Sequence, residues 1–183
     1  MSTADLNTYG ALRTYRADLH IHTALSPCAG DEMTPPAIVE AAAEAGLQII
    51  AISDHNTAGN VAAVQAAAET AGNRLTVLPG MEVTSAEEAH VLGVFPDLQA
   101  AEGAATELRA LLPQAGPGYQ ARFGEQTLLT SEGRPAGTED SALASATTLD
   151  LAATVELIHR SGGLAIAAHV DRRVFSVYSQ LGF

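Results

Sequence analysis

His20 and His22 are separated by one residue at the end of a run that is typical of a β-strand. Alternate side chains of a strand point to the same face, so both imidazole rings can reach one cation. Similar polar residues end or open apolar runs further along the chain. They are Asp54, His55, Glu82, His90, His169 and Asp171. Together these residues predict a metal site assembled at the ends of several strands.

Each of these residues also has a structural interpretation when it is taken alone. Asp54 could cap the next helix, and Glu82 could be a solvated turn residue. His90 could be a hydrogen-bonded core histidine, whereas His169 follows five apolar residues and needs a polar partner there. A structural interpretation of all of them would require several coincidences at neighbouring strand ends. The combination therefore favours metal binding.

Two further residues are less specific. Cys28 lies in a loop six residues after His22, and it is either a small packed side chain or a soft metal ligand. His159 lies near the end of a predicted helix, where a positive charge suits the helix dipole, so we interpret it as structural or solvated.

Strands and helices alternate along the predicted chain. The strands are expected over 14–19, 47–52, 75–78, 90–95 and 164–168, and the helices over 37–45, 59–70, 97–112 and 150–160. A turn is expected at Pro79-Gly80. Such alternation favours a parallel α/β sheet or barrel, in which sites form at the carboxyl ends of the strands. Every candidate ligand except His90 follows a predicted strand.

The 183 residues are enough for a single domain with a sizeable core. Residues 1–13 form a lead-in, and 113–148 are expected to be an insertion or a flexible loop, because they are polar and have no clear period. No apolar run is long enough to span a bilayer, and the N-terminus has no secretory pattern, so we expect a cytoplasmic protein without membrane contact. The single cysteine fits a reducing compartment.

The net charge is −12. This balance opposes binding of a long nucleic acid, which favours a basic surface, but it does not exclude a small phosphorylated substrate. We therefore expect no long nucleic acid as a partner. The sequence gives no indication of an oligomeric state.

Four segments resemble successive signatures of the PHP (polymerase and histidinol phosphatase) family. They are Asp18-Leu19-His20-Ile21-His22-Thr23, Ser53-Asp54-His55-Asn56-Thr57, Gly80-Met81-Glu82-Val83-Thr84 and Ala168-His169-Val170-Asp171-Arg172. They occur in the family's order and span about residues 14 to 173. The resemblance implies a distorted (β/α)7 barrel that binds two to three divalent ions, commonly zinc, manganese or iron.

The resemblance also implies roles for individual residues. His20 and His22 would hold one ion with Glu82, which would bridge to a second ion. His90 and His169 would hold that second ion. His55 would belong to a third site, where Cys28 stands in place of a histidine found in many relatives. A thiolate there would favour zinc or iron.

The family normally ends with an Asp-X-His motif on a late strand, and this chain has none after His169. Asp171 is too close to His169 to replace that strand. We therefore expect a PHP-type barrel that is incomplete at its C-terminus, in which the closing strands are absent.

The leading functional hypothesis is a metal-dependent phosphoesterase that hydrolyses a small phosphate ester through a metal-activated water. Glu82 would hold the metals, Asp54 would orient a histidine ligand, and Arg172 would clamp a phosphate oxygen unless it forms a surface ion pair. The alternatives are a non-catalytic metal-binding or interaction domain, a nuclease, and an amidohydrolase that uses the same cluster.

Overall fold

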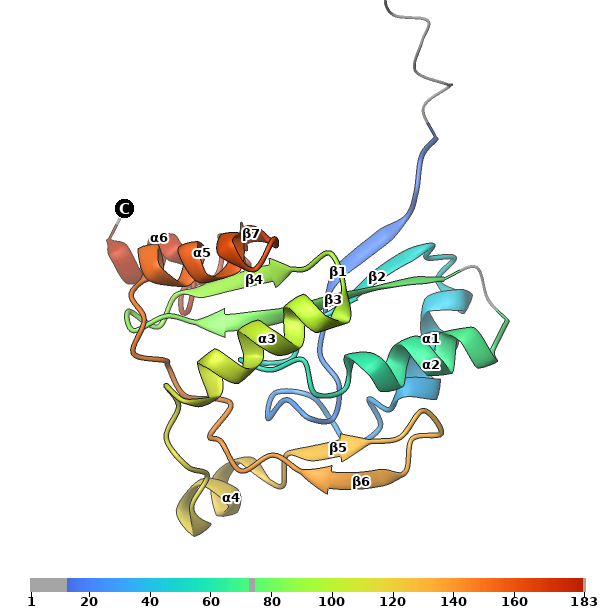
Figure 1. The fold of residues 1–183 in the computed structure, drawn as a ribbon, viewed down its shortest axis with the longest axis horizontal. Helices are drawn as coiled ribbons and strands as arrows, with labels where there is room; N and C mark the ends of the chain where they lie inside the picture. Colours follow the sequence, from blue (N-terminus) through green and yellow to red (C-terminus); the bar gives the residue numbers. More distant parts are fainter. Residues whose placement is uncertain (1–12, 73–74, 183) are drawn as a thin grey trace, which may run out of the picture.

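The computed structural model describes residues 13–72 and 75–182. Except for Arg13, the expected lead-in lies outside these residues. Five strands form the main sheet in the order β1-β2-β3-β4-β7, as Figure 1 shows. They are β1 (Ala17–Ile21), β2 (Ile49–Ile52), β3 (Thr76–Thr84), β4 (His90–Val94) and β7 (Leu164–Ala167). The six helices of the described residues are α1 (Pro35–Glu44), α2 (Val61–Thr70), α3 (Leu98–Arg109), α4 (Pro117–Phe123), α5 (Leu151–Arg160) and α6 (Val177–Leu181).

The sheet is mixed rather than fully parallel. β1, β2 and β3 are parallel, whereas β4 is antiparallel to both β3 and β7. The start of β4 therefore lies at the same edge as the carboxyl ends of the other four strands. The expected α/β architecture is confirmed, and the expectation of a purely parallel sheet was wrong. The count of seven barrel strands stays a prediction.

β3 runs without interruption through the expected turn at Pro79-Gly80, which was therefore a wrong prediction. The backbone N–H of Phe95 donates to the Pro79 carbonyl at 2.9 Å, so this proline still takes part in sheet pairing. A β-carbon on Gly80 would lie 2.8 Å from the Ile52 carbonyl oxygen and 3.1 Å from that of Gly93. Glycine is required here because β2 and β4 approach the backbone of β3 from both sides.

Replacing Gly80 by alanine should therefore destabilise the fold. Because both obstructing atoms are backbone carbonyl oxygens, we expect a loss of about 1–3 kcal/mol in the free energy of unfolding. Gly103→Ala is the matched control, because its β-carbon meets nothing within 4 Å and lies in α3. That control should stabilise the protein by up to about 1 kcal/mol. Urea denaturation measures both, and equal stabilities of the two variants would contradict the prediction.

The hydrophobic core lies between the sheet and its helices. α2 and α3 pack on β3, while α5 packs on β4 and β7. Fully buried residues fill this space, namely Ile50, Ile52, Val61, Val64, Met81, Leu108 and Ile158. This core fixes the strands whose ends carry the polar residues.

The segment 113–148 contains regular structure and is not a structureless loop. It holds α4 and a hairpin of β5 (Thr127–Leu129) and β6 (Pro135–Thr138), which lies below the main sheet in Figure 1. Buried Gln126 organises it, because its amide donates to the carbonyls of Glu139 at 2.8 Å and Ser141 at 2.6 Å. The backbone N–H of Leu129 donates to Asn60 at 2.9 Å and joins the hairpin to the loop after β2.

Candidate metal centre

The predicted ligands converge at one edge of the main sheet. His20 and His22 come from β1 and its end, and His55 follows β2. His90 opens β4, and the antiparallel direction of this strand brings it to the same edge. The remaining two ligands are Glu82 on β3 and His169 after β7.

Glu82 is the centre of the cluster, and 1% of its surface is exposed. Its Oε1 atom lies 3.0–3.2 Å from a nitrogen of His20, His90 and His169. Its Oε2 atom lies 3.3 Å from His22 Nε2 and 3.4 Å from His55 Nδ1. Five imidazole rings therefore face one buried carboxylate.

These distances fit metal coordination. Two donors that each lie about 2.0–2.1 Å from a tetrahedral zinc ion are about 3.3 Å apart. His20 Nε2 and His22 Nε2 are 3.1 Å apart, and both face Glu82. Nδ1 of His55 and Nδ1 of His90 are buried and have no hydrogen-bond partner in the described structure, although both lie near the Glu82 carboxylate. Donor atoms that approach a carboxylate without hydrogen-bond geometry suit ligands of a shared cation.

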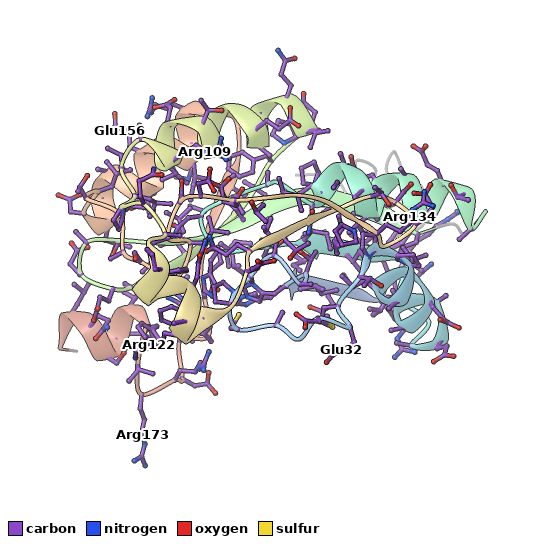
Figure 2. All side chains as sticks on the ribbon, turned by 90° about the horizontal axis from the view of Figure 1, so that it is seen from below. Glu32, Arg109, Arg122, Arg134, Glu156 and Arg173 are labelled. Atoms are coloured by element: carbon purple, nitrogen blue, oxygen red, sulfur yellow. The ribbon has the colours of Figure 1, made fainter. Side chains whose placement is uncertain are left out.

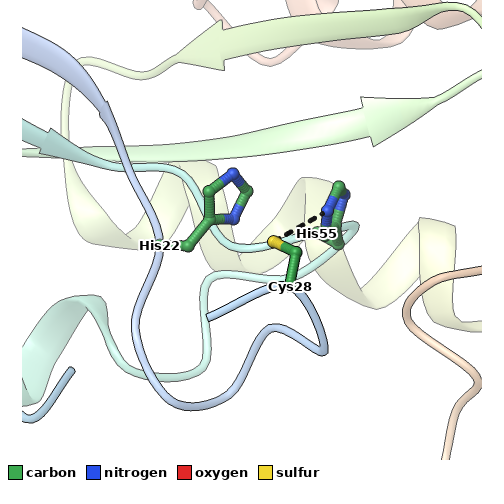
Figure 3. A group of neighbouring side chains, drawn as sticks. All are labelled: His22, Cys28 and His55. Atoms are coloured by element: carbon green, nitrogen blue, oxygen red, sulfur yellow. Dashed lines mark hydrogen bonds between the residues drawn. The ribbon is translucent and has the colours of Figure 1, made fainter. Parts of the chain in front are cut away.

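Three groups of donors are close enough together to hold an ion. They are His20–His22–Glu82, His55–Glu82–His90 and His22–Cys28–His55. The third group is drawn in Figure 3, where the Cys28 sulfur lies 3.4 Å from His55 Nε2. His55 thus directs one nitrogen towards Cys28 and the other towards Glu82.

Asp54 does not contact a histidine side chain directly. It is fully buried and accepts hydrogen bonds from the Thr23 backbone at 2.7 Å, the Thr23 hydroxyl at 2.8 Å and the Ser26 hydroxyl at 2.7 Å. Burial raises the pKa of Asp54, and these hydrogen bonds oppose that shift. Ser26 in turn lies 3.1 Å from His22 Nδ1. The sequence alone indicated no functional role for Ser26.

A pocket of about 480 Å³ opens above the cluster and is also lined by Arg172 and Phe175. The Phe175 ring stacks on His90, with ring centroids 4.8 Å apart. Phe175 was missed by the sequence interpretation, because its position depends on a left-handed backbone, with φ of 62°, in the loop after β7. His159 is exposed on α5 and is not part of this pocket.

The carboxylate and the histidines perturb one another strongly. Burial opposes the charged form of Glu82, but the close approach of His20, His22 and His90 outweighs it and holds the pKa of Glu82 well below its usual range. Burial likewise opposes the charged form of His22, yet hydrogen bonds with Cys28 and Glu82 raise its pKa to about 10. Burial lowers the pKa of His55 to about 3 and also lowers that of His169.

Metal binding should therefore release a proton from His22. Below pH 10 the metal-free ring is protonated, and a metal ion must displace that proton. We expect the apparent Zn²⁺ affinity to rise about tenfold per pH unit across the neutral range. Competition titrations measure the slope, and calorimetry in two buffers of different ionisation enthalpy counts the protons. An affinity that does not change with pH would contradict this prediction.

Comparison with known proteins gives several relatives. The 5'-3' exoribonuclease Rnm of Escherichia coli (strain K12) is 32% identical over 84 residues, which are 44% of this chain and 28% of Rnm. The chain thus spans less than a third of the length of this relative.

Solved structures share the fold at lower identity. A protein assigned as a metal-dependent phosphoesterase from Bifidobacterium adolescentis has a TM-score of 0.60 and 21% identity, over 93% of this chain and 73% of its own. Endonuclease Q of Pyrococcus furiosus has a TM-score of 0.60 and 20% identity, over 90% of this chain and 36% of its own. An amidohydrolase from Chromobacterium violaceum has a TM-score of 0.57 and 20% identity, over 86% of this chain and 68% of its own.

These relatives correct the expectation about nucleic acids. One relative is named an exoribonuclease, and an endonuclease Q structure holds a 27-mer duplex with an abasic lesion at the active site. Net charge of a whole chain was therefore a poor criterion for excluding a long nucleic acid, because a substrate contacts only the surface near the site.

In the described residues, no helix has the length and apolar character needed to cross a membrane.

A match to a family model identifies the family of this chain. The PHP domain model matches residues 18–180, which include all four segments that carry the sequence resemblance. The matched region also contains every residue that faces Glu82. The chain therefore belongs to the PHP domain family.

Proposed function

We propose that this chain hydrolyses phosphate esters with divalent metal ions held by the Glu82 cluster. The observation that carries the proposal is the buried Glu82 carboxylate, which has five histidine nitrogens within 3.4 Å at the floor of an open pocket. Bound divalent ions would lower the pKa of a water molecule and offset negative charge on a phosphate oxygen.

The donor groups support a division of roles among the ligands. His20 and His22 would share one ion with Glu82, as the resemblance to the PHP family implies. His90 and His169 would hold a second ion with the same carboxylate, and His169 Nε2 lies 3.0 Å from it. His55 also faces Glu82, so it has access to this second group as well as to the Cys28 group. Zinc, manganese and iron all suit a mixed set of imidazole and carboxylate donors.

Arg172 supplies the positive charge at the pocket. It lines the pocket beside His169, and its guanidinium forms no ion pair with any residue in the described ranges. A free guanidinium can donate two parallel hydrogen bonds to phosphate oxygens. We propose that Arg172 orients the phosphate group, while the open pocket leaves room for the alcohol part of the ester.

The substrate can be a small phosphate ester or the end of a nucleic acid. The second possibility is favoured by the relatives Rnm and endonuclease Q. In Figure 2, Arg122 and Arg173 lie on the same side of the molecule, whereas Arg134 lies at the opposite end. Arg172 lines the pocket itself, so the phosphate at the reacting end of either substrate is the group that it would contact.

A metal-dependent hydrolysis assay tests the proposal. Chelator-treated protein would be reloaded separately with Zn²⁺, Mn²⁺ or Fe²⁺ and incubated with p-nitrophenyl phosphate, a 5′-phosphorylated RNA oligonucleotide and an N-acyl amino acid. Release of phosphate or nucleotide only after metal addition would support a phosphoesterase. Cleavage of the amide alone would favour an amidohydrolase, and metal binding without turnover of any substrate would favour a non-catalytic domain.

A further inference from the structure

The hydroxyl of Ser26 lies beside the candidate metal ligands and contacts three groups. It lies 2.7 Å from an Asp54 carboxylate oxygen, 3.1 Å from His22 Nδ1 and 3.0 Å from the backbone nitrogen of His55. Only 1% of Ser26 is exposed, so water does not compete for these contacts. One side chain thus connects the loop after β1 with the loop after β2.

The proton positions around Ser26 follow from the available donors and acceptors. The Thr23 hydroxyl accepts from the backbone of Leu25 at 3.2 Å and from Asn60 at 2.9 Å, so its own proton points to Asp54. The Thr23 backbone N–H also donates to Asp54. Asp54 Oδ2 accepts from the Thr23 hydroxyl, while Oδ1 accepts from both the Thr23 backbone and the Ser26 hydroxyl, so the single Ser26 proton points to Asp54.

Both lone pairs of Ser26 are then acceptors. One receives the backbone N–H of His55, which is a fixed donor. The other faces His22 Nδ1, which must carry a hydrogen in order to donate to it. A neutral His22 ring that is protonated at Nδ1 has its lone pair on Nε2, the atom that lies 3.3 Å from Glu82 and 3.1 Å from His20.

We propose that Ser26 is a positioning residue that transmits the orientation of Asp54 to His22 and fixes the tautomer in which His22 Nε2 binds the metal. This inference rests on the proposed metal centre. The same hydroxyl sets the distance between His22 and His55, because it holds the His55 backbone as well as the His22 ring. Asp54 acts on the cluster through this hydroxyl and has no direct contact with a ligand side chain among the described residues.

Zinc titration of Ser26→Ala tests the proposal. The variant loses the acceptor for His22 Nδ1, and we expect its Zn²⁺ dissociation constant to rise about 10- to 100-fold, as for other groups that orient a metal ligand. Ser53→Ala is the matched control. Ser53 is equally buried and lies next to Asp54, but its hydroxyl donates to the Leu19 carbonyl at 3.0 Å instead of contacting a histidine ring. Ser26→Thr, which keeps the hydroxyl, should bind zinc more tightly than Ser26→Ala.

Nitrogen-15 NMR of the zinc-loaded wild-type chain gives a second test that needs no variant. We expect zinc on His22 Nε2 and a hydrogen on Nδ1 that exchanges slowly with water, and we expect that protected hydrogen to be absent from Ser26→Ala. Zinc bound at His22 Nδ1 would overturn the proposal, as would equal zinc affinities of Ser26→Ala and Ser53→Ala. If the wild-type chain bound no zinc, manganese or iron, the metal centre itself would fail. If the wild type bound metal and hydrolysed an ester while Ser26→Ala bound equally well, only the role of Ser26 would fail.

Discussion

Replacing Glu82 by glutamine should remove most of the metal bound by this protein and nearly all of its hydrolytic activity. The carboxylate belongs to two of the three donor groups, and five histidine nitrogens lie within 3.4 Å of it. An amide has almost the same volume but no charge, and its NH2 group would face rings that must direct lone pairs towards a cation. We expect a loss of at least one bound ion per chain and a rate lowered on the order of 10³-fold or more.

Elemental analysis of protein purified without chelator measures the first effect, and phosphate release measures the second. Glu156→Gln is the matched control, because this glutamate is exposed on α5 and labelled at the periphery in Figure 2. It makes the same chemical change far from the cluster and should leave both quantities unchanged. A Glu82→Gln variant that kept its metal and its rate would rule out the Glu82 cluster as the active site.

Most of the candidate site could be predicted from the sequence because its ligands are polar residues at the ends of apolar runs. His20 lies near the end of β1, and His22, His55 and His169 follow β1, β2 and β7. These three strands run in one direction, so they end at one edge of the sheet. His90 was the exception, because it opens its strand instead of lying at the carboxyl end. It joins the cluster because β4 runs the opposite way, and an apolar run such as His90–Val94 has the same composition in either direction.

The supporting contacts could not be predicted in the same way. Ser26 lies in a turn-like sequence, and nothing in its type or spacing indicates that a carboxylate 28 residues later would accept its proton. Pro79-Gly80 was interpreted as a turn because local propensity favours one there. Tertiary packing decided otherwise, since two neighbouring carbonyls approach Gly80 so closely that only glycine fits within the strand. Contacts between segments that are distant in the sequence thus explain why the role of Ser26 was missed and why the turn at Pro79-Gly80 was wrongly predicted.

The structure also limits which ring nitrogens each donor group can offer to a metal ion. Because His22 Nδ1 contacts Ser26, only Nε2 of this ring is free for a metal ion, yet His22 belongs both to the group with His20 and to the group with Cys28. His55 instead has a separate nitrogen for each side of the cluster. An ion beside Cys28 would therefore depend mainly on the Cys28 thiolate and His55 Nε2.

Replacing Cys28 by serine should consequently remove this third ion while leaving the Glu82 groups occupied. The thiolate is the soft donor of its group, and soft donors favour zinc or iron over manganese. In cobalt-loaded wild-type protein we expect a thiolate-to-cobalt charge-transfer band in the near ultraviolet, and we expect this band to be absent from Cys28→Ser. The number of tightly bound zinc ions per chain should also fall by about one.

Cys28→His provides the matched comparison, because it restores a nitrogen donor at the position where the resemblance to the PHP family implies a histidine. This variant should regain the lost ion but bind manganese relatively better than the wild type does, since imidazole is a harder donor than a thiolate. The exposed position of Cys28 leaves room for the larger ring. A wild-type cobalt spectrum without the charge-transfer band would show that Cys28 is not a ligand. The cluster would then consist only of the donors around Glu82, and the approach of Cys28 to His55 would be a contact of the loop alone.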